Sequence, residues 1–228
     1  GIAERRMWKI YQLDPESITH NIGLVLTFGP SYSVDDVVAS LRLMVRNAAV
    51  LGSTIVVDDN GVPRRSPDRH DGRWVEPGAV WEWGVLPAYD MSAPVSDIAA
   101  ALGKSPFDLR NEPPMRARVQ ATDGGVTVVL VVHHLAVDAV SWHILIDDLA
   151  DVCRQVERDS GSAVLQPVPT SYRAYARAVN EEAQRASRLA EFEHWSATLA
   201  PGGELDADAL TVGLTVGATR DHEVVLDV

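Results

Sequence analysis

The sequence has a single cysteine, Cys153, so the chain cannot form an internal disulfide bond. This suits a reducing compartment, and we expect the protein to be cytoplasmic. Long apolar runs are absent as well, since the stretch 126–132 is far shorter than the roughly 20 residues that cross a bilayer. No basic segment leads into an apolar one at the start. The sequence therefore predicts neither a membrane partner nor a secretory signal.

Basic side chains are scarce relative to acidic ones. Lysine and arginine number 20 against 32 aspartate and glutamate residues, which gives a formal net charge of −12. Binding to a phosphate backbone needs a basic footprint, so we expect no nucleic-acid partner. The rest of the composition is ordinary for a globular protein, with 46% hydrophobic residues over 228 positions. This length is enough for one large domain or two small ones.

Periodic apolar positions predict alternating strands and helices. Strands are expected at 22–28, 54–57, 80–86, 115–121, 126–132 and 223–228, and helices at 33–49, 96–102, 140–157 and 171–199. Ser33 and Asp36 predict a capped start for the first helix. Asp123-Gly124-Gly125 predicts a hairpin, and the almost wholly apolar strand after it is expected at the centre of its sheet. The alternation indicates an α/β fold, a mixed β-sheet flanked by helices.

The residues that could carry chemistry follow that apolar strand directly. His133 and His134 end it, Asp138 comes four residues after His134, and a helix is expected to begin beyond. Junctions from strand to helix are where α/β proteins often place reactive groups. Successive strand residues point to opposite faces, so one histidine can face a cleft while the other is tied into the structure. For the same reason the pair cannot readily share one ion, and we expect no metal site.

Purely structural roles for these residues also remain open. Two histidines at a strand end are often plain hydrogen-bonded residues. Asp138 could hold a neighbouring charge, or it could cap the helix that follows it. His20 has no companion group at ligand spacing in the sequence, so we expect it to be an ordinary surface residue.

The segment 133–142 resembles the HHxxxDG signature of the condensation superfamily of nonribosomal peptide synthetases, with Ala139 in place of the final glycine. Further landmarks of that family are resembled, in the same order, by 5–8, 12–15, 105–109, 113–117, 171–176 and 194–195. The resemblance implies a chloramphenicol-acetyltransferase-like lobe, one half of a two-lobed, V-shaped domain. Residues 1–200 would form the N-terminal lobe, and 201–228 a linker and first strand leading toward the C-terminal lobe.

The resemblance also implies a function in nonribosomal peptide biosynthesis. A donor acyl or aminoacyl thioester, carried on the phosphopantetheine of a peptidyl or acyl carrier protein, is attacked by an acceptor to form an amide or an ester. His134 matches the second histidine, which positions or deprotonates the acceptor. No cofactor is bound intrinsically, and the partners are the carrier protein and the C-terminal lobe. The other site residues are the structural supports His133, Asp138 and Arg116 and the channel neighbours Ala139, Ser141 and Trp142.

Two departures from the family pattern bear on this site. In the family an arginine pairs with the motif aspartate, but Gly52 stands at the matching position here. Arg116, Arg46 or a residue of the other lobe would have to take its place, unless Asp138 is unpaired. Ala139 adds a methyl group beside the acceptor channel, which could narrow the choice of acceptor.

Two other functions remain open from the sequence. Ser141-Trp142 after the aspartate resembles epimerization domains, in which His134 would exchange the α-proton of a carrier-bound peptidyl thioester, with a glutamate of the other lobe. The opening segment 5–8 and the segment 13–17 look more like condensation domains. The third possibility is a non-catalytic module that only docks a carrier protein.

Overall fold

The computed structural model describes residues 1–67, 72–76, 80–159, 163–165, 171–185 and 187–200. It divides into two compact units, Gly1–Ala176 and Arg177–Val228. The predicted strand 223–228 and the predicted linker 201–228 lie outside the described residues. Within those residues, no helix is long and apolar enough to cross a membrane.

The first unit holds the strands and all the helices up to the start of α5. The strands are β1 (Asn21–Phe28), β2 (Ser53–Val57), β3 (Pro63–Pro67), β4 (Arg73–Glu76), β5 (Val80–Trp83), β6 (Met115–Thr122) and β7 (Gly125–His133). The helices are α1 (Ile2–Leu13), α2 (Val34–Asn47), α3 (Val95–Gly103), α4 (Ala139–Arg158), α5 (Tyr172–Ala183) and α6 (Ser187–Leu199). Helix α5 begins in the first unit and continues into the second, which also contains α6.

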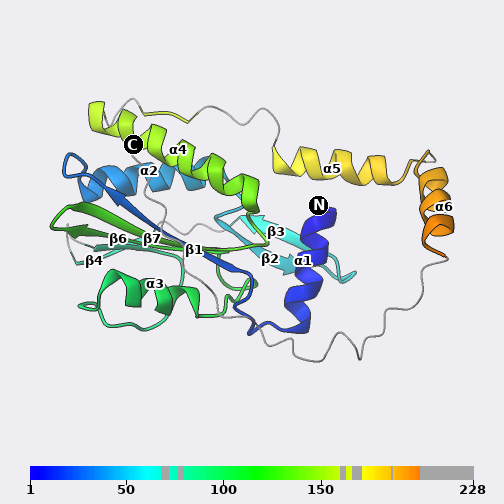
Figure 1. Ribbon diagram of the computed structural model, residues 1–228, viewed down its shortest axis with the longest axis horizontal. Helices are drawn as coiled ribbons and strands as arrows, with labels where there is room; N and C mark the ends of the chain where they lie inside the picture. Colours follow the sequence, from blue (N-terminus) through cyan, green and yellow to red (C-terminus); the bar gives the residue numbers. More distant parts are fainter. Residues whose placement is uncertain (68–71, 77–79, 160–162, 166–170, 186, 201–228) are drawn as a thin grey trace. The chain divides into compact units, whose positions relative to one another are not determined.

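Five strands form one sheet in the order β1-β7-β6-β5-β4 (Figure 1). Strand β7 lies between β1 and β6 and is buried along nearly its whole length, which confirms its predicted central position. The α/β class is confirmed with one correction, because each described pairing is antiparallel and the sheet is not mixed. The β1–α2–β2 segment is no parallel crossover, since β2 leaves this sheet and pairs with β3 in a separate two-stranded sheet.

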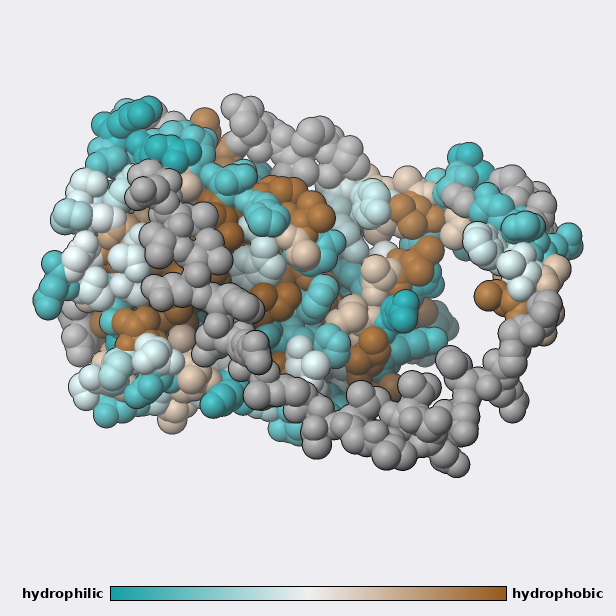
Figure 2. Space-filling view, in the orientation of Figure 1, coloured by the Kyte–Doolittle hydropathy of each residue, from teal (hydrophilic) through white to brown (hydrophobic). Residues whose placement is uncertain are grey.

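Helices cover both faces of the five-stranded sheet. Figure 1 shows α2 and α4 on one face and α3 on the other. Because side chains alternate along a strand, β7 sends Val128 and Leu130 into the core beneath α2 and α4, and Val129 and Val131 into the core beneath α3 and α1. Figure 2 shows apolar surface over the first turns of α4, where side chains such as Val140 are exposed. The sheet therefore separates two cores, and the end of β7 lies where both meet.

Local signals in the sequence explain several element boundaries. The β6–β7 hairpin turns at Asp123-Gly124 as predicted, and Gly125 has φ +134°, where an added Cβ would lie 2.1 Å from the Phe28 carbonyl oxygen. The predicted helix 171–199 is instead two helices, because amides at Gln184 and Arg185 bond three residues back and end α5. Helix α1 and strands β3 and β4 were not predicted, since β3 reads Pro-Arg-Arg-Ser-Pro and lacks apolar alternation.

The predicted N-cap of α2 is confirmed and supports a first testable expectation. Ser33 Oγ accepts a hydrogen bond from the Asp36 amide, and the Asp36 carboxylate accepts one from the Ser33 amide. We expect Ser33→Ala to lower the free energy of unfolding by about 1 kcal/mol, because the Asp36 amide in the first turn loses its hydrogen-bond acceptor. Urea unfolding measures this, with Ser31→Ala as the matched control outside the cap. Equal effects of the two substitutions would contradict the assignment.

Candidate functional site

The site is built at the junction between β7 and α4. Asn21 of β1 pairs with His133, and Met115 of β6 pairs with Val132, so both neighbouring strands hold the end of β7. Asp138 is the N-cap of α4, and its carboxylate accepts hydrogen bonds from the Ser141 amide at 2.8 Å and the Ser141 hydroxyl at 2.6 Å. The junction is therefore a short loop between two rigid elements.

His133 is an internal, neutral member of the site. Its side chain is only 3% exposed, and its ring lies about 6 Å, centroid to centroid, from the rings of Tyr11, His20 and Phe107. The Nδ1 atom accepts a hydrogen bond from the Leu135 amide at 3.0 Å, so the neutral ring carries its proton on Nε2. Burial, together with the neighbouring His20 and His134, lowers the pKa of His133 to about 4. These contacts are what a structural histidine would make.

The low pKa of His133 makes the stability of the lobe depend on pH. The ordinary pKa is 6.5, so between that value and about 4 the unfolded chain binds more protons than the folded one. Stability is then full above pH 6.5 and falls as the pH is lowered through this window, by roughly 3 kcal/mol in total. Unfolding experiments at pH 7.5 and 5 should show about 2 kcal/mol of this loss, since pH 5 lies within the window. His133→Gln keeps a hydrogen-bonding side chain that does not titrate, and an unchanged pH dependence in this variant would contradict the assignment.

His134, in contrast, is exposed and lies in the turn that follows β7. Its backbone amide donates a hydrogen bond of 2.8 Å to the His20 carbonyl, which fixes the backbone while the imidazole faces outward. The two histidines thus lie in different environments, as predicted, but not for the predicted reason, because β7 ends at His133 and His134 lies in the turn after it. An exposed ring on a fixed backbone is what a group that meets a substrate needs.

His20 was expected to be an ordinary surface residue, and this prediction is wrong. The side chain is half-buried, with its ring 6.0 Å from the ring of His133 and 6.4 Å from that of His134. The neighbours are remote in sequence and meet only because β1 pairs with β7. No sequence signal marks this contact. Among the described residues, no group of three His, Cys, Asp or Glu side chains is arranged to hold a metal ion.

The loop after His134 is anchored in both cores. Leu135 packs with the core on the α3 side of the sheet, and Val137 packs with the core on the α4 side. The Ala136 amide donates to the His133 carbonyl, and the Leu135 carbonyl accepts a hydrogen bond of 3.0 Å from Arg65. Arg65 was not among the predicted site residues, because its strand β3 was not predicted.

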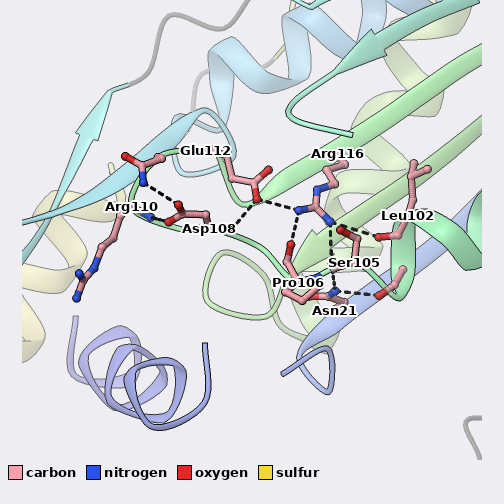
Figure 3. A network of polar contacts seen from close by, with 10 residues as sticks. Asn21, Leu102, Ser105, Pro106, Asp108, Arg110, Glu112 and Arg116 are labelled. Carbon is pink, nitrogen blue, oxygen red and sulfur yellow. Dashed lines mark hydrogen bonds and ion pairs between the residues drawn. The ribbon is translucent and has the colours of Figure 1, made fainter. Parts of the chain in front are cut away.

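Arg116 organises a neighbouring segment and does not approach Asp138. Figure 3 shows its guanidinium donating to the carbonyls of Ser105 and Pro106, at 2.8 and 2.6 Å, and to Glu112 Oε1 at 2.8 Å. The guanidinium also lies 3.9 Å from the centroid of the Phe107 ring, which in turn touches the ring of His133. Arg116 therefore supports the site through the segment 105–112.

Arg116 was a candidate to replace the family arginine that pairs with Asp138, but the sheet separates the two residues. Arg116 projects from β6 on the α3 side of the sheet, whereas Asp138 begins α4, which covers the opposite face. Arg46, the other substitute within this chain, is exposed near the end of α2. The Ser141 hydroxyl and amide lower the pKa of Asp138 by hydrogen bonding, so this carboxylate is stabilised as a helix cap.

The remaining motif residues lie along the first turn of α4. Ala139 is exposed, Ser141 is half-buried against Asp138, and Trp142 packs partly into the core beneath α2 and α4. The Trp142 indole Nε1 is buried, and within the described part of the chain it has no hydrogen-bond partner. Ala139 is thus the most exposed of the three.

Comparisons with known proteins agree on one family. A family model described as the condensation domain matches residues 3–209. The chain is 34% identical over 116 residues to Bacitracin synthase 3 of Bacillus licheniformis, and 37% identical over 93 residues to Surfactin synthase subunit 2 of Bacillus subtilis (strain 168). These matches cover 50% and 41% of this chain but only 2% and 3% of those proteins.

Solved structures resemble the chain over most of its length. The starter condensation domain of rhizomide synthetase superposes with a TM-score of 0.65 at 16% identity, covering 90% of this chain and 48% of that one. The first condensation domain of the calcium-dependent antibiotic synthetase gives a TM-score of 0.65 at 20% identity, covering 89% and 47%. At these identities the likeness shows the fold, and the chain spans about half of each structure.

Proposed function

Because the chain belongs to the condensation-domain family, we propose that it serves condensation-type acyl transfer in nonribosomal peptide biosynthesis. The donor is an acyl or aminoacyl thioester held on the phosphopantetheine of a carrier protein. An acceptor amine or alcohol attacks the thioester carbonyl, an amide or ester bond forms, the acyl C–S bond breaks, and the phosphopantetheine thiol leaves on the carrier protein. The observation that carries the proposal is the exposed imidazole of His134 beside the buried, neutral His133, on a strand end held from both sides.

His134 acts on the acceptor nitrogen or oxygen. A neutral imidazole accepts a proton as the nucleophile attacks the thioester carbonyl, and it also orients the nucleophile by hydrogen bonding. General-base catalysis supplies ~10²–10⁴-fold, or roughly 3–5 kcal/mol, whereas full orientation supplies about 7–11 kcal/mol. A thioester is already a reactive acyl donor, so orientation is the larger contribution of this site.

The neighbouring groups keep His134 available for this role. His133 is neutral above about pH 4 and adds no positive charge beside His134 at physiological pH. His20 holds the His134 backbone through its carbonyl, and Asp138 starts α4 immediately beyond the loop. Ala139 and Ser141 lie beside the acceptor. The proposed site uses side chains of the chain itself, with no intrinsic cofactor.

Two partners complete the proposed site. A carrier protein delivers the donor, and in peptide elongation a second carrier holds the acceptor. The second lobe of a condensation domain supplies the other wall of the channel, since this chain spans about half of the solved condensation domains that it resembles. Activity is therefore a property of the protein that contains both lobes.

The test uses the full-length protein that carries this sequence. It is incubated with a carrier-bound donor and an acceptor amine in deuterated buffer, and the products are analysed by mass spectrometry. Condensation predicts a new amide or ester. Exchange of the α-proton for deuterium without a new bond would instead establish epimerization, which Ser141-Trp142 favours. Carrier binding without either reaction would establish a docking module.

A further inference from the structure

Arg65 on β3 links the loop after His134 to three other parts of the fold. Its Nη2 donates to the Leu135 carbonyl at 3.0 Å, and its Nη1 donates to Ser53 Oγ at 2.9 Å and to the Val50 carbonyl at 3.2 Å. Its Nε forms an ion pair with Glu4 of α1. The Arg65 side chain is only 18% exposed. A side chain from the small two-stranded sheet therefore reaches both the N-terminal helix and the motif loop.

The contact with Leu135 adds a polar restraint to the packing of the loop. The Leu135 amide is held by His133 Nδ1, and the Ala136 amide by the His133 carbonyl, so both of these hydrogen bonds run back to His133. Arg65 is the group that holds this loop from a separate sheet. The Leu135 carbonyl belongs to the residue directly after His134, so its orientation affects where the His134 ring points.

The position of Arg65 is also related to Gly52, which stands where the family has an arginine. A Cβ built on Gly52 would lie 3.2 Å from Val45 Cγ1 and 3.8 Å from Trp83 Cζ2, so a side chain at this position would run into the packed core. Arg65 instead bonds to residues 50 and 53, which flank Gly52. Here the arginine that contacts the histidine motif comes from β3, and it binds the backbone of the motif and not its aspartate.

The ion pair with Glu4 holds the guanidinium in one orientation. Burial by itself would raise the pKa of Glu4, but the charge of Arg65 and hydrogen bonds that include Tyr172 and Arg65 keep that pKa below its ordinary value. The carboxylate is therefore ionised throughout the physiological range. A planar guanidinium bonded in three directions at once tolerates little rotation.

We propose that Arg65 is a positioning residue for the reaction at His134: by holding the Leu135 carbonyl, it sets the loop that aims the imidazole at the acceptor. This rests on the acyl-transfer function proposed above. A misplacement of about 1 Å in a reacting group can cost ~10²-fold in rate. Arg65 is largely buried and holds the backbone of the loop, so we expect its loss to act on the rate of reaction and not on substrate binding.

The first test compares Arg65→Gln with Arg64→Gln in the full-length protein. Arg64 is the next residue on β3, is 68% exposed and pairs with Asp58 inside the β2–β3 hairpin, so it is a matched control. We expect Arg65→Gln to lower kcat for amide formation by about 10- to 100-fold, with the KM for the acceptor changed less than about threefold. Arg64→Gln stays at the wild-type rate. A kcat for Arg65→Gln within twofold of the control overturns the proposal.

The second test does not depend on catalysis. Hydrogen–deuterium exchange of peptides that span 133–138 reports on the Leu135 and Ala136 amides, and we expect faster exchange in Arg65→Gln than in Arg64→Gln. Equal exchange in the two variants overturns the proposal, whatever their rates. If the wild-type protein catalyses no acyl transfer, the proposed function fails while exchange still tests the loop restraint.

A conservative variant covers the case in which Arg65→Gln does not fold. Arg65→Lys keeps the charge, but one ammonium group cannot reach Glu4, Ser53 and Leu135 together in the geometry of a planar fork. We expect it to fold and to lose at least about threefold in kcat, together with faster exchange of 133–138. Wild-type values for both overturn the proposal.

Discussion

Replacing His134 with alanine is expected to lower kcat for amide formation by about 10²-fold or more. The variant loses both the proton acceptor and the hydrogen bond that orients the nucleophile. Stability should not change, because the side chain is exposed and the restraint on the backbone comes from the His20 carbonyl. The measurement is single-turnover transfer from a loaded carrier protein, together with the unfolding midpoint.

Two further variants test whether the effect is specific to His134 and whether it comes from proton transfer or from orientation. His143→Ala removes an exposed histidine from the same region, in the second turn of α4, and is expected to keep the wild-type rate. His134→Asn retains a hydrogen-bonding side chain that cannot serve as a base at neutral pH, so activity closer to wild type than to His134→Ala would assign the main effect to orientation. A kcat for His134→Ala within twofold of wild type would remove His134 from the reaction.

Replacing Arg116 with methionine is expected to produce the largest loss of stability, about 3–5 kcal/mol. Arg116 is 2% exposed and Glu112 4% exposed, so the substitution leaves a buried carboxylate without its cation. The Pro106 carbonyl also loses its donor, and the Ser105 carbonyl loses one of its two donors and keeps the Asn21 side-chain amide. Chemical denaturation of the lobe measures the effect, and the loosening of Phe107 against His133 should lower the rate as well.

The control for this prediction lies on the same segment. Arg110 is exposed, with its guanidinium 5.6 Å from the centroid of the Trp8 ring, and Arg110→Met should cost less than about 1 kcal/mol. Adding Glu112→Gln to Arg116→Met should recover part of the lost stability, because a neutral amide is less costly to bury than a carboxylate. If Arg116→Met were no more destabilising than Arg110→Met, the buried pair would not stabilise the lobe.

Local patterns accounted for much of the fold and for the core of the site. The capping box at Ser33, the turn at Asp123-Gly124 and the burial of β7 were all predicted from residues close together in the sequence, and all three are confirmed. Different environments for His133 and His134 were also predicted and are found, although His134 lies in the turn after β7 and not in the strand. The predicted single helix 171–199 was wrong, because α5 ends in a turn. The backbone hydrogen bonds of that turn have no signal in the sequence.

The residues alone determined which groups are available and how the short elements present them: an apolar strand, two adjacent histidines at its end, and an aspartate that starts a helix. Only tertiary structure decided their surroundings. It placed His20 beside His133 and His134, paired Arg116 with Glu112 in a buried salt bridge, and brought Arg65 to the loop after His134. The physical reason is the range of the interactions. Periodicity and capping involve neighbours within a few residues, whereas these contacts depend on which strands pair and on which face each side chain lies.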